Sequence, residues 1–149
     1  MKAVIQRATR AAVRVDGQTI GEIKQPGLVV LLGITHDDGR DDTAKIVKKL
    51  SQLRVLDNPD PDGPEQSVVE AGAPLLVISQ FTLYASTKKG RRPSFTHAAP
   101  GDIAEPLYND VVTGLRQLGL HVETGQFGAM MEVELVNNGP YTLIVESRN

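Results

Sequence analysis

The sequence predicts an α/β fold in which helices pack against one layered, mixed and barrel-like sheet. Three observations support this prediction. Apolar runs of strand length recur along the chain, two segments show helical periodicity instead, and no linker or internal repeat divides residues 1–149. The expected order is β-β-β-α-β-α-β-β-β, in a single compact domain spanning residues 1–149. A chain of 149 residues, 40% of them hydrophobic, can bury a substantial core.

Three strands are expected before the first helix. Residues 2–15 are rich in apolar and β-branched side chains, as in a strand. Asp16-Gly17 suits a tight hairpin, because both central turn positions need positive φ, and a second strand should follow it through Ile20. The continuous apolar run 28–34 is typical of a strand buried on both faces.

Two helices are expected from apolar residues at helical spacing. Asp41 or Asp42 can cap the first helix. Its apolar face consists of Ile46, Val47, Leu50 and Leu53. The second should start near Asp102, with Glu105 completing a capping box, and end at Gly119. Its apolar stripe consists of Leu107, Val111, Leu115 and Leu118.

The remaining segments alternate between loops and strands. Residues 58–64 contain three prolines and predict a loop, and the polar, basic residues 86–99 predict an exposed one. Further strands are expected at 75–81, 121–124, 131–136 and 141–145. The Asn-Asn-Gly-Pro sequence between the last two is a turn signal, and its simplest structural interpretation is a hairpin loop.

Composition excludes several kinds of chemistry. The chain has no cysteine, so disulfides, thiolate metal sites and a cysteine nucleophile are excluded. Its three histidines lack metal-ligand spacing, and no metal or organic cofactor is expected. The first residues do not form a signal peptide, and no apolar run could span a bilayer. We therefore expect a cytoplasmic protein without a membrane partner.

The distribution of charge is more informative than the total. The formal net charge is only -2, but Lys88, Lys89, Arg91 and Arg92 form a local basic cluster. Such a cluster can bind phosphates, although it can equally be a solvated face.

Two segments carry candidate chemistry. In residues 79–84 polar residues interrupt the end of an apolar strand, where α/β proteins often place a site; the alternative is that they bond the neighbouring backbone. In residues 137–142 a cis Gly-Pro bond would set two carbonyl groups side by side as an acceptor pair. The alternative there is an ordinary hairpin.

With these two segments the chain resembles the D-aminoacyl-tRNA deacylase family over essentially its whole length. One family motif matches Ser79, Gln80 and Thr82, and the other, Asn-x-Gly-Pro-x-Thr, matches Asn137, Gly139, Pro140 and Thr142. Residues 1–7, 87–95 and 123–128 agree as well. The joint occurrence of these motifs in a chain of this length is far more specific than any one of them.

The resemblance implies a homodimer with two active sites at its interface. It implies that Gly139 and Pro140, joined by a cis bond, reach into the partner's pocket as a chirality filter. The catalytic positions, which form the pocket floor, would be Ser79, Gln80, Phe81 and Thr82. The substrate- and tRNA-binding positions would be Arg7, Phe127, Met131 and Asn137, to which the charge of the basic cluster adds Lys88 and Lys89 as contacts to tRNA phosphates. Among these, Arg7 would support the Gly-Pro loop, while Phe127 and Met131 would help to hold the terminal adenosine.

The implied reaction is hydrolysis of the ester that joins a D-amino acid to tRNA, with L-aminoacyl-tRNA rejected and glycyl-tRNA accepted. Backbone N–H groups of Phe81 or Thr82 could form an oxyanion hole, which we favour over a nucleophilic Thr82 because no base lies near it in the sequence. The family is thought to enlist the ribose 2′-hydroxyl of the tRNA. The partners expected are therefore tRNA and a second copy of the chain, and not DNA. The alternatives are a module that binds the tRNA 3′ end without turnover and a structural dimer.

Overall fold

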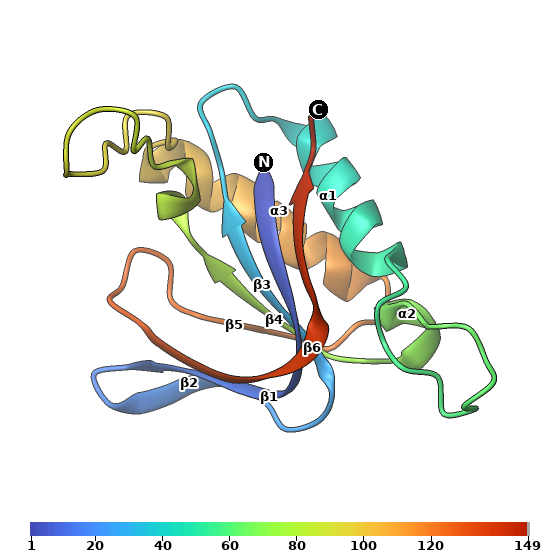
Figure 1. Ribbon diagram of the computed structural model, residues 1–149. Helices are drawn as coiled ribbons and strands as arrows, with labels where there is room; N and C mark the ends of the chain where they lie inside the picture. Colours follow the sequence, from blue (N-terminus) through green and yellow to red (C-terminus); the bar gives the residue numbers. More distant parts are fainter. Residues whose placement is uncertain (149) are drawn as a thin grey trace.

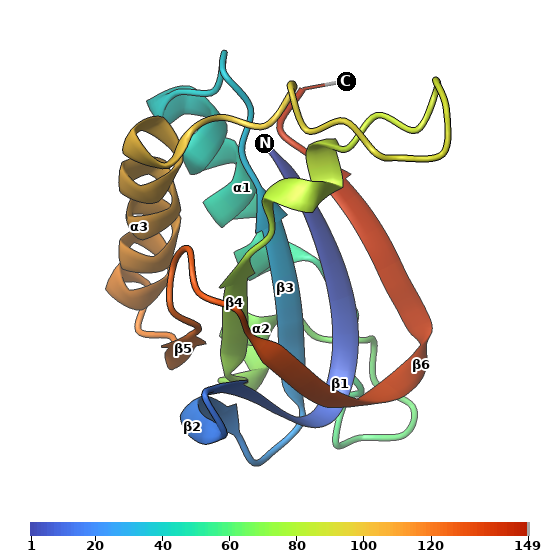
Figure 2. The same cartoon turned by 90° about the vertical axis from the view of Figure 1, so that its left-hand side faces the viewer.

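Within residues 1–148, six strands form one mixed sheet that curls on itself, with the two long helices against one face (Figures 1 and 2). The structure is a computed structural model and describes residues 1–148. The elements in chain order are β1 (Lys2–Val15), β2 (Gln18–Ile23), β3 (Gly27–Gly33), α1 (Arg40–Gln52), α2 (Val68–Ala71), β4 (Leu75–Ser79), the 3-10 turn η1 (Phe81–Tyr84), α3 (Gly101–Gln117), β5 (Val122–Thr124) and β6 (Glu132–Glu146). The predicted α/β class with a mixed, barrel-like sheet is confirmed.

Strand β1 organises the sheet. One of its edges pairs antiparallel with β3 over residues 2–8 and with β2 over residues 11–15, and the other pairs antiparallel with β6. Strands β3, β4 and β5 are parallel. The hairpin between β1 and β2 is confirmed, because Asp16 and Gly17 both have positive φ, at 50° and 76°.

The curl of the sheet brings β2 against β5. A Cβ added to Gly21 would lie 2.5 Å from the carbonyl oxygen of Thr124, so this backbone approach requires glycine. The sheet is therefore nearly closed, and its concave side encloses a small apolar cluster. That cluster is Ala8, Ala11, Val13, Ile23, Val29, Leu76 and Ile78.

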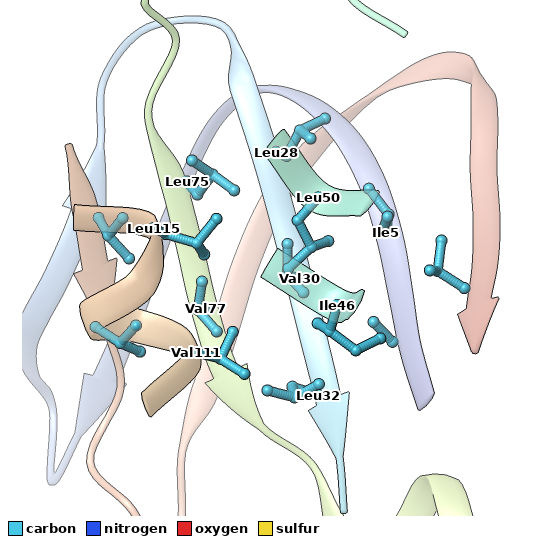
Figure 3. Packing of buried hydrophobic residues seen from close by; sticks show 14 of the residues in the cluster. Ile5, Leu28, Val30, Leu32, Ile46, Leu50, Leu75, Val77, Val111 and Leu115 are labelled. Atoms are coloured by element: carbon cyan, nitrogen blue, oxygen red, sulfur yellow. The ribbon is translucent and has the colours of Figure 1, made fainter. Parts of the chain in front are cut away.

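The larger core lies between the sheet and the helices. Alternate residues of β3 and β4 point toward α1 and α3, as Figure 3 shows for Leu28, Val30 and Val77. The residues between them point into the curl, so β3 is buried on both faces, as its continuous apolar run predicts. No helix within residues 1–148 is long and apolar enough to cross a bilayer.

The helix starts differ from expectation. Helix α1 is capped by Gly39, whose N–H donates to the Asp42 carboxylate (3.1 Å), so the acid lies inside the first turn and is not the cap itself. Helix α3 is capped by Pro100, without the side-chain bonds of a capping box at Asp102 and Glu105. The helix dipole stabilises acidic residues anywhere in the first turn. An acid that caps the helix and an acid inside its first turn therefore look alike in sequence.

The apolar stripe of α3 is also rotated from the expected one. Leu118 is half-exposed and lies at the C-cap, just after the last helical residue. The buried residues are Ala104, Tyr108, Val111, Val112 and Leu115, which face both the sheet and α1. Two short elements, α2 and η1, were not predicted, since four residues are too few for a periodic pattern. Accordingly, β4 ends at Ser79 rather than Phe81.

The predicted hairpin at 137–142 is wrong. Residues 132–146 form one bent strand, β6, and both of its halves pair with β1. Gln6 pairs with Thr142 and Ala8 with Asn137, so the four residues 138–141 bulge out opposite the single residue Arg7. The turn-forming residues interrupt the ladder without reversing the chain, because β1 is long enough to pair on both sides of them. We call residues 138–141 the bulge.

Candidate functional site

A cavity of about 560 Å³ opens where β4 leaves the sheet. Its floor is the segment Ser79, Gln80, Phe81 and Thr82, and its walls come from β3, the start of α3 and residues 127–133. The structure thus brings the four predicted catalytic positions together with Phe127 and Met131, although about fifty residues separate the two groups in the chain. Small residues at Ala99, Gly101 and Ala104, which no motif marked, leave room for the cavity.

The floor forms because β4 stops abruptly. The Gln80 N–H donates to the Leu32 carbonyl (2.8 Å), which is the last bond to β3 before η1 begins. The N–H groups of Phe81 and Thr82 come first in this 3-10 turn and have no hydrogen-bond acceptor within residues 1–148. Two unpaired backbone donors therefore lie at the cavity floor, which is what an oxyanion site needs.

No side chain that lines the cavity within residues 1–148 is titratable. The Thr82 hydroxyl accepts a hydrogen bond from the Gln80 amide (2.5 Å), and an amide is no base. Tyr108, whose ring lies 6.0 Å from that of Phe127, donates its hydroxyl proton to the Val77 carbonyl (2.8 Å), and burial raises the pKa of Tyr108 to about 12. Ser79, Gln80 and Thr82 therefore bring polar side chains to the cavity but no general base at neutral pH, and the Tyr108 hydroxyl stays bonded to Val77.

The backbone of residues 79–82 forms the cavity floor, and the side chains of Phe81, Phe127 and Met131 contribute an aromatic and sulfur-containing lining that we call the rim. Phe127 is half-buried against Tyr108, and Met131 packs across Gly125, where an added Cβ would lie 2.5 Å from the Met131 sulfur. Phe81 is 54% exposed and meets Phe95 edge to face at 5.3 Å between ring centroids. A flat, apolar ligand group is the kind that such a rim accepts.

The second candidate segment is held by Arg7. Its Nε donates to the Asn138 carbonyl (2.9 Å) and its Nη2 to the Gly139 carbonyl (2.6 Å). Its Nη1 donates to the Val55 carbonyl (3.1 Å) and to the Asp57 carboxylate (2.9 Å). The guanidinium therefore fixes two carbonyls of the bulge, and the Gly139–Pro140 bond there is cis, as the resemblance implies.

The bulge and the cavity lie at different ends of the sheet. Arg7 pairs with Leu28 at the start of β3, whereas Gln80 of the cavity floor is hydrogen-bonded to Leu32 near the end of β3. Four residues of strand correspond to roughly 13 Å. Accordingly, neither Gly139 nor Pro140 lines the cavity of its own chain.

The other predicted positions lie outside the cavity. Asn137 is exposed in β6 beside the bulge, where it pairs with Ala8. Lys88 and Lys89 lie in the exposed loop that projects from the molecule in Figures 1 and 2, closed at its base by backbone bonds between Ser86 and Ser94. Two contacts could not be predicted from the sequence, namely Asp57 with Arg7 and Glu65 with Tyr141. In each, a loop residue bonds a residue that is far away in the chain.

Comparison with known proteins gives one family for the whole chain. The model of the family described as D-Tyr-tRNA(Tyr) deacylase matches residues 4–146. The chain is 52% identical over 147 residues to the D-aminoacyl-tRNA deacylase of Kineococcus radiotolerans, covering 99% of this chain and 100% of that protein. It is likewise 52% identical over 149 residues to the D-aminoacyl-tRNA deacylase of Halalkalibacterium halodurans, covering 99% and 100%.

Solved structures agree on the fold. The protein named c-Myc DNA Unwinding Element Binding Protein superposes with a TM-score of 0.91 at 39% identity, and the match covers 100% of both chains. A probable eukaryotic D-amino acid tRNA deacylase superposes with a TM-score of 0.84 at 17% identity, covering 97% of this chain and 98% of that one. At that lower identity the likeness establishes the fold alone.

Proposed function

Because this chain belongs to the D-Tyr-tRNA(Tyr) deacylase family, we propose that it frees tRNA from D-amino acids in the cytoplasm and rejects L-aminoacyl-tRNA through a filter at Gly139 and Pro140. Family membership makes it a deacylase, an enzyme that hydrolyses the ester of an aminoacyl-tRNA. The observation that carries the activity is the 52% identity over essentially the full length of curated deacylases. Residues 1–149 act as one deacylase domain in this proposal.

The cavity supports a reaction without a covalent intermediate. Water attacks the ester carbonyl carbon, the bond to the ribose oxygen breaks, and that oxygen leaves with a proton. The N–H group of Phe81 or Thr82 stabilises the oxyanion, while Ser79 and Gln80 shape the floor. Since the lining residues include no base, the ribose 2′-hydroxyl of the substrate relays the proton. Phe127 and Met131 hold the terminal adenosine at the rim.

A second copy of the chain completes the site in this proposal. The bulge lies roughly 13 Å along β3 from the cavity of its own protomer, so Gly139 and Pro140 act in the cavity of the partner. Apolar side chains are available for such an interface, since Met130 is 92% and Ile144 69% exposed. A Cβ added to Gly139 would meet only Asn137 Nδ2, at 4.0 Å, so its own protomer does not require glycine there.

The filter selects by repulsion. If Gly139 and Pro140 hold the amino group of the substrate, an L side chain collides with their backbone, whereas a D side chain points away. Asn137, next to the bulge, contacts the same end of the substrate. Glycine has no side chain to exclude, so glycyl-tRNA also enters.

The proposed function is tested by following D-tyrosyl-, L-tyrosyl- and glycyl-tRNA side by side with the purified chain. We expect the D ester and the glycyl ester to be hydrolysed and the L ester to survive. Hydrolysis of both tyrosyl esters would contradict the filter. Binding of tRNA with no hydrolysis of any ester would instead favour a module that binds the tRNA 3′ end.

The basic loop at Lys88 and Lys89 is proposed to contact backbone phosphates of the tRNA. Replacing both lysines with alanine should weaken tRNA binding and lower the slope of log Kd against log salt by about 1 for each phosphate that is no longer neutralised. The matched control is Lys45→Ala with Lys48→Ala on the exposed side of α1, which removes the same charge elsewhere. Equal salt slopes for the two double variants would show that the loop is only a solvated face.

A further inference from the structure

The bulge that carries Gly139 and Pro140 has a second support besides Arg7, namely the loop between α1 and α2. We call residues 57–65 the proline loop. Paired backbone bonds between Leu56 and Gln66 close it at its base (3.0 and 2.8 Å). Its first residue, Asp57, accepts a hydrogen bond from Arg7 (2.9 Å), and its last, Glu65, accepts one from the hydroxyl of Tyr141.

The proline loop is stiff although it is exposed. The side chain of Asn58 crosses it, donating to the Pro64 carbonyl (2.8 Å) and accepting from the Asp60 N–H (3.0 Å). The Gly63 N–H donates to the Asp60 carbonyl (2.9 Å), and three prolines restrict φ in between. Glu65 is therefore held on a prearranged frame rather than on a loose loop.

Tyr141 links this frame to the bulge. It directly follows Pro140, its ring lies 5.0 Å from Arg7 Cζ, and its hydroxyl donates to Glu65. The same bond to Glu65 is the main reason that the pKa of Tyr141 is raised, so the hydroxyl stays a donor. Glu65 is thus connected to Pro140 through a single residue.

We propose that Tyr141 and Glu65 are positioning residues of the Gly139–Pro140 filter, and that the proline loop thereby sets how strictly L-aminoacyl-tRNA is rejected. This inference rests on the filter proposed above. Arg7 fixes the carbonyls of Asn138 and Gly139, at the first half of the bulge. Tyr141 anchors the other end, so the two supports enclose the Gly-Pro bond between them.

The test compares Tyr141→Phe, Glu65→Ala and Glu65→Gln with the wild type on D- and L-tyrosyl-tRNA. Tyr141→Phe removes one hydroxyl and keeps the ring over Arg7. We expect the ratio of D to L hydrolysis to fall about 2- to 10-fold, the equivalent of one hydrogen bond, chiefly through faster loss of the L ester. Glu65→Ala should behave alike, whereas Glu65→Gln keeps an acceptor oxygen and should restore part of the ratio.

Asp62→Asn is the matched control, because it removes one charge from the same loop and its carboxylate makes no hydrogen bond or ion pair within residues 1–148. Its ratio should equal that of the wild type. In the double variant, Tyr141→Phe should add nothing to Glu65→Ala, since both break one bond.

Two results would overturn the inference while leaving the filter intact. One is that the wild type discriminates D from L and that Tyr141→Phe and Glu65→Ala have the same ratio of D to L hydrolysis as the wild type. The other is an equal loss of both activities together with a lower melting temperature, which would indicate a role in folding only. A wild type that does not discriminate D from L would instead refute the proposed function itself.

Discussion

Proline in place of Phe81 is expected to slow hydrolysis of D-tyrosyl-tRNA about 100- to 1,000-fold, the usual cost of losing one oxyanion donor. The substitution deletes the N–H of residue 81, one of the two unpaired backbone donors at the cavity floor. The backbone can accept it, because proline is favoured at the first position of a helical turn and Gln80 before it is not helical (φ -141°, ψ 79°). Single-turnover hydrolysis measures the effect on the chemical step directly.

Phe81→Ala separates the donor from the ring. It keeps the N–H and removes only the aromatic side chain with its contact to Phe95, so we expect a rate much closer to the wild type. If the proline and alanine variants are equally slow, the N–H of Phe81 is not the donor. Thr82→Ala should retain measurable activity, and an acyl group trapped on Thr82 would instead establish a covalent step.

Much of the fold follows from local patterns. The apolar run before Ile34 predicts β3 correctly, because a strand buried on both faces leaves little room for polar side chains. The hairpin at Asp16-Gly17 follows from two adjacent positive φ values. Ile46 and Leu50 face the core as their helical spacing predicts. Each of these features is determined within a few residues of chain.

The bulge in β6 could not be predicted in this way. Its residues are those of a turn, and whether the chain reverses depends on the length of β1, more than a hundred residues earlier. The same holds for the site. Polar residues after β4 predict its floor, but Phe127 joins them only through the fold, and Glu65 reaches Tyr141 across 76 positions. These contacts depend on which segments the fold brings together, so no local sequence pattern predicts them.

Replacing Arg7 with alanine should affect both stability and selectivity. Arg7 is 6% exposed, and its removal leaves the carbonyls of Val55, Asn138 and Gly139 without their donor. We expect the free energy of unfolding to fall by about 2–4 kcal/mol, since each buried unpaired acceptor is costly but water reaches some of them. Urea denaturation at a fixed protein concentration measures this, because dimer formation would contribute to stability.

Arg7→Lys distinguishes charge from geometry. Lysine keeps the positive charge but donates from one nitrogen, so it does not reproduce the fork that holds two bulge carbonyls at once. We therefore expect a smaller loss of stability than in Arg7→Ala, but a comparable fall in the ratio of D to L hydrolysis. The control is Arg14→Ala. In the wild type the Arg14 guanidinium pairs with the exposed Glu134 (3.2 Å), also between β1 and β6. The variant should lower the free energy of unfolding by about 1 kcal/mol at most and leave the ratio of D to L hydrolysis unchanged. A wild-type ratio in Arg7→Lys would mean that charge alone positions the bulge, and the hydrogen-bond fork would then have no part in chiral selection.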